Sequence, residues 1–467
     1  MGEPVSQTPP SESGGGFKRG MWSSRTGFIL AAAGSAIGLG NIWKFPYIAG
    51  VNGGGAFVLI YLVAIVLVGY PIMLAELVIG RNTQASPVVA FGKLAGPESK
   101  WKMLGWLGVL TGFIILSYYS VVAGWALNYV LMSVCDFLSN KSPEQISSLF
   151  DKLYVAGDIN LFWHTLFMLL TIGIVFGGVK KGIERWARIL MPMLFLIMLI
   201  LVARVVFLPG FVRGVSFVFA PNFDKLTAAG VLEAVGHAFF TLSLGMGAML
   251  TYGSYLSKKT DLVKASAVVC SLDLIIALMS CLIIFPIVFS FGFEPDQGPG
   301  LVFKTIPVVL SQIAGGELLA ILFFLLLAFA ALTSSISLLE VVTSHFIDSF
   351  GWSRKKATLI PGLLILLFGI PSALAGGGGL FSSWESIVGK NFFDTVDYLA
   401  TNWMLPLGGI LIAIFIGWFA PLERIKDEFQ TGSKFKHIFI VWLWAIRVIV
   451  PIVMVVVLLY KVRILDL

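Results

Sequence analysis

Residues 31–41 read AAAGSAIGLGN and residues 239–250 read FFTLSLGMGAML, and each stretch interrupts a long apolar run of the chain with glycine. Glycine has no Cβ atom, so its backbone can adopt dihedral angles outside the helical range. Both stretches also carry small and hydroxyl residues where a lipid-facing helix would carry leucine. Close packing of helices through small residues, which is common in membranes, is the alternative interpretation. We expect a helix break at each stretch, because the two stretches lie in the first and the sixth of the long apolar runs, which are corresponding positions.

The composition of the whole chain is that of a membrane protein. Of the 467 residues, 58% are hydrophobic and 12% are charged, and the mean hydropathy is +0.93. A typical soluble domain has about 25% charged residues, so a soluble enzyme is excluded. Each apolar run is near the ~20 residues that a helix needs to cross the hydrocarbon layer. The runs predict an all-α polytopic protein with eleven transmembrane helices, at 24–49, 55–79, 103–134, 160–177, 183–208, 229–256, 261–292, 317–349, 357–374, 392–419 and 437–460.

The two glycine-interrupted stretches lie in the first and sixth of these spans, five spans apart. A repeat of five spans reverses its orientation in the membrane, so the two breaks occupy corresponding positions of two inverted halves. Such pairs of interrupted segments indicate a transporter binding site. We therefore expect a transporter domain at 18–467, with inverted repeats at about 24–208 and 229–419 and an additional helix at 437–460. Residues 1–17, rich in Pro, Ser and Gly, are expected to form a disordered tail.

Basic residues are concentrated on one side of the predicted membrane domain. Most of the 32 Lys and Arg residues fall in the loops that share a side with the N-terminus. Cytoplasmic loops carry such an excess, so we expect a cytoplasmic N-terminus and an external C-terminus, in the plasma membrane (the inner membrane of a bacterium). The net charge of +7 then orients the protein among membrane lipids, and no nucleic-acid partner is expected. The sequence leaves the oligomeric state open.

Several motifs resemble those of a known family. Residues 34–47 read GSAIGLGNIWKFPY, residues 52–57 read NGGGAF, residues 239–255 read FFTLSLGMGAMLTYGSY and residues 330–335 read AALTSS. Together they resemble the neurotransmitter:sodium symporter family, close to its bacterial amino-acid members of the leucine-transporter type and to the multi-hydrophobic amino acid transporters. The resemblance implies the leucine-transporter (LeuT) fold, a 5+5 inverted repeat with broken first and sixth helices. It also implies sodium-coupled symport of L-amino acids by alternating access.

Oxygen ligands for two sodium ions follow from the resemblance. Carbonyl and hydroxyl oxygens suit a hard cation such as Na⁺, which needs no Cys or His ligand. The first sodium site would use Ala36, Asn41, Thr241 and Asp273. The second would use Gly34, Ile37, Ala330, Thr333 and Ser334. For Thr333 and Ser334 the alternative is a hydrogen bond back to a carbonyl of their own helix.

The substrate site is expected between the two breaks. The N–H groups at 38–40 would open a half-helix, whose positive end suits a carboxylate. By resemblance, the Tyr119 hydroxyl would donate to that carboxylate, the carbonyls of Phe240, Thr241 and Ser243 would receive the amino group, and Phe240 would act as a lid. The whole expected set is Ala36, Gly38, Leu39, Gly40, Ile115, Tyr119, Phe240, Thr241, Ser243, Met246, Ser334 and Leu338.

Two features of this set bear on selectivity. Family members that carry amines without a carboxylate have an aspartate where this chain has Gly38, so the glycine favours an α-amino acid. Met246 has a flexible thioether and stands between Gly245 and Gly247, which have no side chains. We expect a roomy apolar pocket for the side chain of Leu, Met, Phe, Tyr or Trp.

Ionisable residues inside the spans are expected to form gates, because such residues are costly in a membrane. By resemblance, Lys44 and Asp397 form an outer gate, although the family more often has arginine than lysine at this position. Lysine cannot make the bidentate contact of arginine, so this closure is expected to be looser. The inner gate would pair Arg19 with Asp348, near Trp22 and Tyr255. For Arg19 the alternative is a role as one of the positive-inside charges.

Asp273, in the seventh span, predicts that chloride is not required. Many animal relatives bind chloride beside the first sodium site and have a neutral residue at this position. Asp273 can supply that negative charge itself, and without the cation it could carry a proton back. The alternative is an aspartate that is merely hydrogen-bonded to neighbouring helices, through Ser271 or Asn41.

Other functional classes are disfavoured by the sequence. A symporter for a small neutral amino acid or an osmolyte is the nearest alternative. A channel is less favoured, because the expected sites are buried and single and do not form rings about a pore. An enzyme is not expected, because the chain has no His-Glu-x-x-His, Gly-x-Ser-x-Gly or Walker sequence and its four histidines are scattered.

Overall fold

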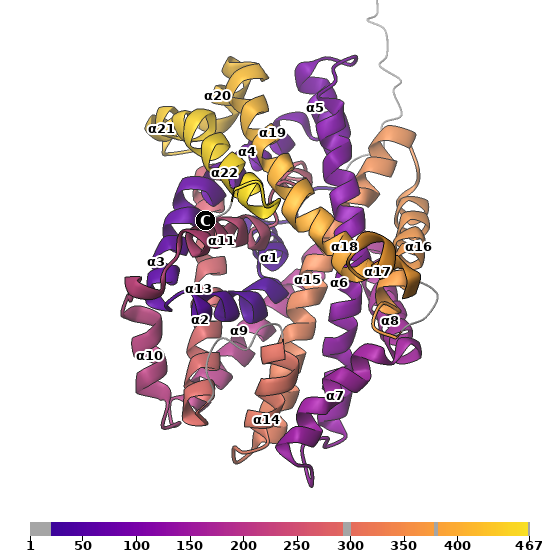
Figure 1. Ribbon diagram of the computed structural model, residues 1–467. Helices are drawn as coiled ribbons and strands as arrows, with labels where there is room; N and C mark the ends of the chain where they lie inside the picture. Colours follow the sequence, from indigo (N-terminus) through magenta and orange to yellow (C-terminus); the bar gives the residue numbers. More distant parts are fainter. Residues whose placement is uncertain (1–19, 293–299, 378–381, 466–467) are drawn as a thin grey trace, which may run out of the picture.

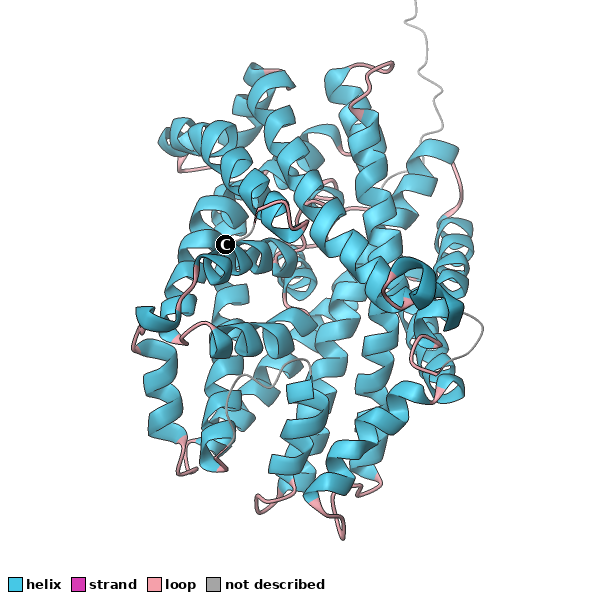
Figure 2. Ribbon diagram, in the orientation of Figure 1, coloured by secondary structure: helices cyan, strands magenta, loops and turns pink. Residues whose placement is uncertain are grey.

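The computed structural model describes residues 20–292, 300–377 and 382–465. Every named element in these residues is a helix, and the one β-bridge, between Gly54 and Pro221, is isolated (Figure 2). The expected all-helical fold class is therefore confirmed for the part of the chain that the structure describes.

The first span is broken, as its glycines predict. Helix α1 (Arg25–Ala36) begins where the Ser24 side chain accepts from the N–H of Gly27. It ends where Ile37 leaves the helical region with a ψ of 92°. The chain continues as a π-helical segment, η1 (Gly40–Lys44), and helix α2 (Phe45–Val51), bent by 53° from α1. The break thus lies within the expected stretch at 31–41, although Gly34 remains inside α1.

The sixth expected span is broken as well. Helix α11 (Ala228–Thr241) and helix α12 (Ala248–Gly253) flank a non-helical stretch at 242–247. Neither helix is long enough to cross a membrane alone. A connection through glycine and serine lets the two short helices serve as one interrupted span.

Nine other helices in the described residues are long and apolar enough to span a membrane. Their ends lie within a few residues of the expected limits. They are Gly55–Thr83 (α3, η2, α4), Lys102–Val134 (α6), Gly157–Phe176 (α8), Val179–Val205 (η3, α9), Leu262–Ser290 (α13), Gly316–Phe350 (α15), Arg354–Ala373 (α16), Phe392–Phe419 (α18, η6, α19, η7) and Lys436–Lys461 (η8, α21, η9, α22).

Shorter helices connect the spans. They are α5 (Pro87–Ala95), α7 (Pro143–Val155), α10 (Phe211–Phe219), η4 (Phe223–Lys225), η5 (Leu301–Thr305) with α14 (Ile306–Leu310), α17 (Ser382–Val388) and α20 (Leu422–Gln430). In Figure 1, α5 and α20 lie at the top, whereas α7, α10 and α14 lie at the bottom. The long helices α6 and α15 pack along each other between these ends. Together with the two broken spans they position the central site.

Candidate functional site

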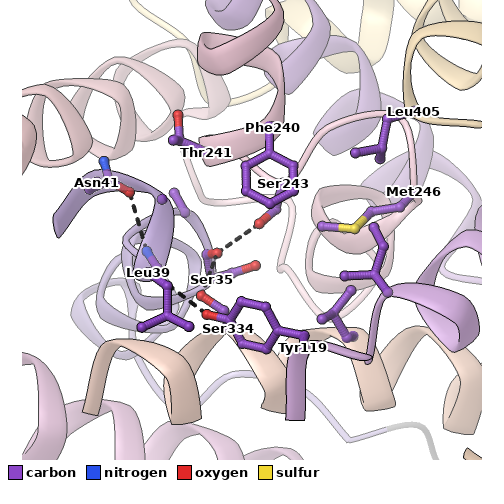
Figure 3. A pocket seen from close by; sticks show the side chains of 15 residues that line it. Ser35, Leu39, Asn41, Tyr119, Phe240, Thr241, Ser243, Met246, Ser334 and Leu405 are labelled. Atoms are coloured by element: carbon purple, nitrogen blue, oxygen red, sulfur yellow. Dashed lines mark hydrogen bonds between the residues drawn. The ribbon is translucent and has the colours of Figure 1, made fainter. Parts of the chain in front are cut away.

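The two helix breaks meet at the centre of the bundle (Figure 3). Ser243, in the second break, donates its hydroxyl to the carbonyl of Ser35 at the end of α1, over 2.7 Å. The Ser35 hydroxyl in turn donates to Ser337 of α15, also over 2.7 Å. Buried backbone carbonyls need a partner, and the Ser243 hydroxyl supplies one to Ser35 from an element that is far away in sequence.

The second break is held by positive-φ residues and by one buried carboxylate. Ser243, Gly245 and Gly247 have φ values of 54°, 81° and 76°. Glu76 of α4, which is fully buried, accepts the N–H of Gly245 at 2.8 Å and the N–H of Leu250 at 3.1 Å. Glu76 was not among the residues expected from the sequence. An acid inside the apolar run at 55–79 was the available signal, because such a residue is costly in a membrane.

A central cavity lies between the breaks, and all twelve residues expected to hold the substrate line it. Ser35, Asn41 and Leu405 line it too, and none of these three was expected in the substrate set. Tyr119 accepts the backbone N–H of Leu39 at 3.3 Å. The N–H of Gly38 is donated to the side-chain oxygen of Asn41, also at 3.3 Å.

The free space in this cavity, which holds no substrate, is about 30 Å³. A water molecule needs roughly 10–15 Å³ of such space, so the cavity holds only a few waters. A Cβ atom at Gly245 would lie 2.6 Å from the carbonyl oxygen of Leu405, and one at Gly247 would lie 2.7 Å from the Pro87 ring. The two glycines therefore permit close packing, and a roomy pocket for the substrate side chain stays a prediction.

The residues expected at the first sodium site form one hydrogen-bonded cluster. Asn41 donates its amide to the Asp273 carboxylate at 2.7 Å. Tyr61 of α3 donates to the other carboxylate oxygen at 2.9 Å, and its hydroxyl lies 3.0 Å from that of Thr241. Ala36 lines the cavity beside them. Tyr61 was missed, because its partners lie 180 or more residues away in the chain.

The residues expected at the second sodium site lie where α1 meets α15. Ser334 donates to the carbonyls of Ser35 at 3.2 Å and Gly34 at 3.4 Å. Thr333 instead donates to Phe329 and Ala330 of its own helix, at 3.1 and 3.0 Å. Ile37 is buried at the break. Hence the Ser334 hydroxyl faces the first break. The Thr333 hydroxyl instead bonds to carbonyls of its own helix, which was the alternative considered for both residues.

The expected outer gate residues line a wide vestibule next to the central cavity. Lys44 and Asp397 both border this vestibule, which has a volume of about 350 Å³. Among the ion pairs of the described residues, none joins Lys44 to Asp397. The Lys44 ammonium lies 5.4 Å from the centre of the Phe240 ring. Tyr119 and Phe240 line both spaces, so they separate the vestibule from the cavity.

The opposite side is closed by packed aromatic residues and one buried ion pair. Trp22 donates its backbone N–H to Tyr255 at 3.1 Å and its indole N–H to the Tyr252 carbonyl at 2.9 Å. Tyr255 donates to Glu340, and Arg354 donates to both oxygens of the same carboxylate. This Glu340–Arg354 pair was not expected from the sequence. Its members stand on two different helices, α15 and α16.

The expected Arg19–Asp348 pair is only partly visible. Arg19 lies outside the described residues. Asp348 accepts the backbone N–H of Ser86 at 2.6 Å, at the start of α5. The structure therefore places Asp348 on the side that Trp22 and Tyr255 close, and the pairing itself stays a prediction.

Several known proteins are similar to this chain over nearly its whole length. A family model described as the sodium:neurotransmitter symporter family matches residues 19–146 and 143–466. The uncharacterized sodium-dependent transporter YhdH of Bacillus subtilis is 42% identical over 446 residues, which cover 95% of this chain and 98% of YhdH. An uncharacterized sodium-dependent transporter of Haemophilus influenzae is 35% identical, covering 94% of this chain and 97% of that protein. The crystal structure of MhsT in complex with L-phenylalanine matches with a TM-score of 0.86 and 45% identity, covering 95% of this chain and 100% of MhsT.

Proposed function

The chain belongs to the sodium:neurotransmitter symporter family, and we propose that it is a sodium-coupled symporter that imports hydrophobic and aromatic L-amino acids by alternating access. Members of this family are sodium-coupled membrane transporters and not enzymes, so the multi-pass topology and the use of Na⁺ follow from membership. The fold of the leucine-transporter type, expected from the motifs, is confirmed by the likeness to MhsT.

The observation that carries the proposed substrate is the composition of the central cavity. One end has the backbone N–H groups of Gly38 and Leu39 with the Tyr119 hydroxyl. A tyrosine oxygen that accepts from Leu39 can still donate its own proton, which suits a carboxylate. The rest of the wall includes Ile115, Phe240, Met246, Leu338 and Leu405, which suit an apolar side chain.

Gly38 supports an amino acid over an amine. A Cβ atom at this position would lie 2.8 Å from the Ser334 hydroxyl and 3.3 Å from the Tyr119 hydroxyl. No side chain at position 38 can therefore supply an acid without displacing these groups, and the substrate must bring its own carboxylate. The complex of MhsT with L-phenylalanine supports the same class of substrate.

We propose two sodium ions and no requirement for chloride. The Asp273 carboxylate, fully buried beside Asn41, Thr241 and Tyr61, would balance the charge of the first ion. The carbonyls near Gly34 and Ala330 with the Ser334 and Thr333 hydroxyls would take the second. Thr333 would have to exchange its bonds to its own helix for bonds to the ion.

The proposed location is the plasma membrane, with the N-terminus in the cytoplasm. Lys93 and Arg424 lie in α5 and α20 at one end of the bundle, which the excess of basic residues marks as cytoplasmic. The vestibule at Lys44 and Asp397 would then open outward, and the packing around Trp22 would close the inward path.

Equilibrium binding to the purified protein tests the substrate class. Labelled L-phenylalanine would be competed by each of the twenty amino acids, in Na⁺ and in K⁺. The proposal expects competition by Leu, Met, Phe, Tyr and Trp, and only in Na⁺. Competition confined to glycine, alanine or an osmolyte such as betaine would favour the alternative symporter and overturn the proposed substrate.

A further inference from the structure

A second cavity lies directly behind the wall of the central one. It has a volume of about 170 Å³, against about 30 Å³ for the central cavity. The two cavities have two lining residues in common, Phe240 and Leu405. These two side chains therefore form the partition between the small space proposed for the substrate and a larger space beside it.

Leu405 is held in this partition by its backbone. It is the first residue of α19 (Leu405–Ile414) and is 3% exposed. Its carbonyl oxygen lies where a Cβ atom of Gly245 would have to be, and Gly408 of the same helix packs against the carbonyl of Gly245. Because α19 packs against the second break at both points, the backbone of Leu405 cannot move away from the cavity unless the break itself moves.

The other residues on this side of the cavity can adapt more easily. Figure 3 shows Phe240, Met246 and Leu405 together on one side, across from Tyr119 and Ser334. Met246 has a flexible thioether that can change rotamer to fit a ligand. Phe240 is only partly buried, borders the open vestibule and can turn toward it. Leu405 has a shorter and branched side chain, and its backbone is held against the second break.

We propose that Leu405 sets the upper size limit for the side chain of the transported amino acid, by closing the second cavity off from the substrate site. The second cavity is then a latent subsite for large fused-ring side chains. This inference rests on the proposed function, because it assumes that the central cavity holds an apolar amino-acid side chain.

The lining of the second cavity is mixed, because Lys44, Glu233 and Lys461 also line it, and a fused ring would lie against its apolar face. Phe239, Pro406, Met454 and Val457 give it apolar walls. His237 is 3% exposed, and neither of its ring nitrogens has a hydrogen-bond partner among the described residues. An aromatic ring that entered along the apolar face would gain contacts with these side chains, and apolar contacts discriminate substrates by about 10- to 200-fold per methylene-sized change.

The test compares Leu405→Ala with Leu407→Ala, a matched control two residues along the same helix. Leu407 is 38% exposed and does not line either cavity. Sodium-dependent binding of L-leucine, L-tryptophan and L-3-(2-naphthyl)alanine would be measured for each protein. Leu405→Ala should raise the affinity for naphthylalanine relative to leucine by about tenfold or more. Because the result is a ratio of two affinities in the same protein, a loss of affinity that is equal for both ligands cancels.

A reverse variant keeps the inference open to contradiction if Leu405→Ala does not fold. Leu405→Phe should lower the affinity for tryptophan relative to leucine, since the partition becomes thicker. Unchanged ratios in either folded Leu405 variant, or an equal change in Leu407→Ala, would overturn the inference and leave the proposed function standing. Failure of the wild-type protein to bind any hydrophobic amino acid would instead overturn the proposed function.

Discussion

The carboxylate of Glu76 accepts the backbone N–H of Gly245 at 2.8 Å, so a residue of α4 fixes the centre of the non-helical stretch between α11 and α12. Its second oxygen accepts the N–H of Leu250 at 3.1 Å. Buried N–H groups without a partner are costly, and here one side chain satisfies two of them. The shape of the central cavity depends on this contact, because the stretch at 242–247 forms one of its walls.

Glu76→Gln should weaken both folding and amino-acid binding. The amide nitrogen of glutamine cannot accept, so one of the two N–H groups loses its partner, at a cost of about 1–3 kcal/mol. We expect a lower melting temperature and weaker sodium-dependent binding of L-phenylalanine. Glu423→Gln makes the same change on the exposed face of α20 and should alter neither. Equal behaviour of the two variants would contradict the role given to Glu76.

Gly38→Ala should abolish or strongly reduce binding. The new methyl group would meet the Ser334 hydroxyl at 2.8 Å, in the space proposed for the substrate carboxylate. We expect a loss of at least about tenfold in affinity, or ~1.4 kcal/mol. Gly173→Ala is the matched control, because a Cβ atom there has nothing within 4 Å. Wild-type affinity in Gly38→Ala would show that the carboxylate binds elsewhere.

Arg354→Lys should increase the fraction of protein molecules whose cytoplasmic side is open. Lysine cannot make the two-pronged contact that Arg354 makes with Glu340. In a Cys135→Ser background, which removes the exposed native thiol, a cysteine introduced at Ser254 should react several-fold faster with a thiol reagent added from the cytoplasmic side. Arg424→Lys, on exposed α20, is the control. An unchanged labelling rate in Arg354→Lys would count against this ion pair as a closure.

Transport by the wild-type protein should not depend on chloride. Replacing chloride by gluconate should leave uptake unchanged, because Asp273 supplies the negative charge beside the first sodium ion. Asp273→Asn should weaken the coupling to Na⁺ or create a chloride requirement. Asp224→Asn, in an exposed turn, should behave like the wild type. Collapse of wild-type uptake in gluconate would show that the site needs an added anion.

The parts of this site that were predictable from sequence are those whose residues stand close together in the chain. The glycines near Ile37 and Met246 mark both breaks locally, and the family resemblance identified twelve of the fifteen residues that line the cavity. The first break lies inside the expected stretch, but Gly34 stays helical, since glycine permits a break without requiring one.

The residues that support the site from other helices could not be found from local sequence patterns. Glu76 and Gly245 are 169 positions apart, and Tyr61 and Asp273 are 212 apart. A single acid or tyrosine in an apolar run indicates that it needs a partner, but not which one. Leu405 carries no signal at all, because a leucine in a membrane helix is ordinary until packing shows which cavity it faces.

Accumulation of labelled L-phenylalanine in proteoliposomes tests the central claim most directly. With Na⁺ outside and K⁺ inside, the account predicts that the amino acid rises above its external concentration, and that the accumulation disappears when K⁺ replaces Na⁺ on both sides. Uptake of L-phenylalanine that is the same with and without the Na⁺ gradient, from protein that is folded and inserted, would contradict sodium-coupled transport of a hydrophobic amino acid.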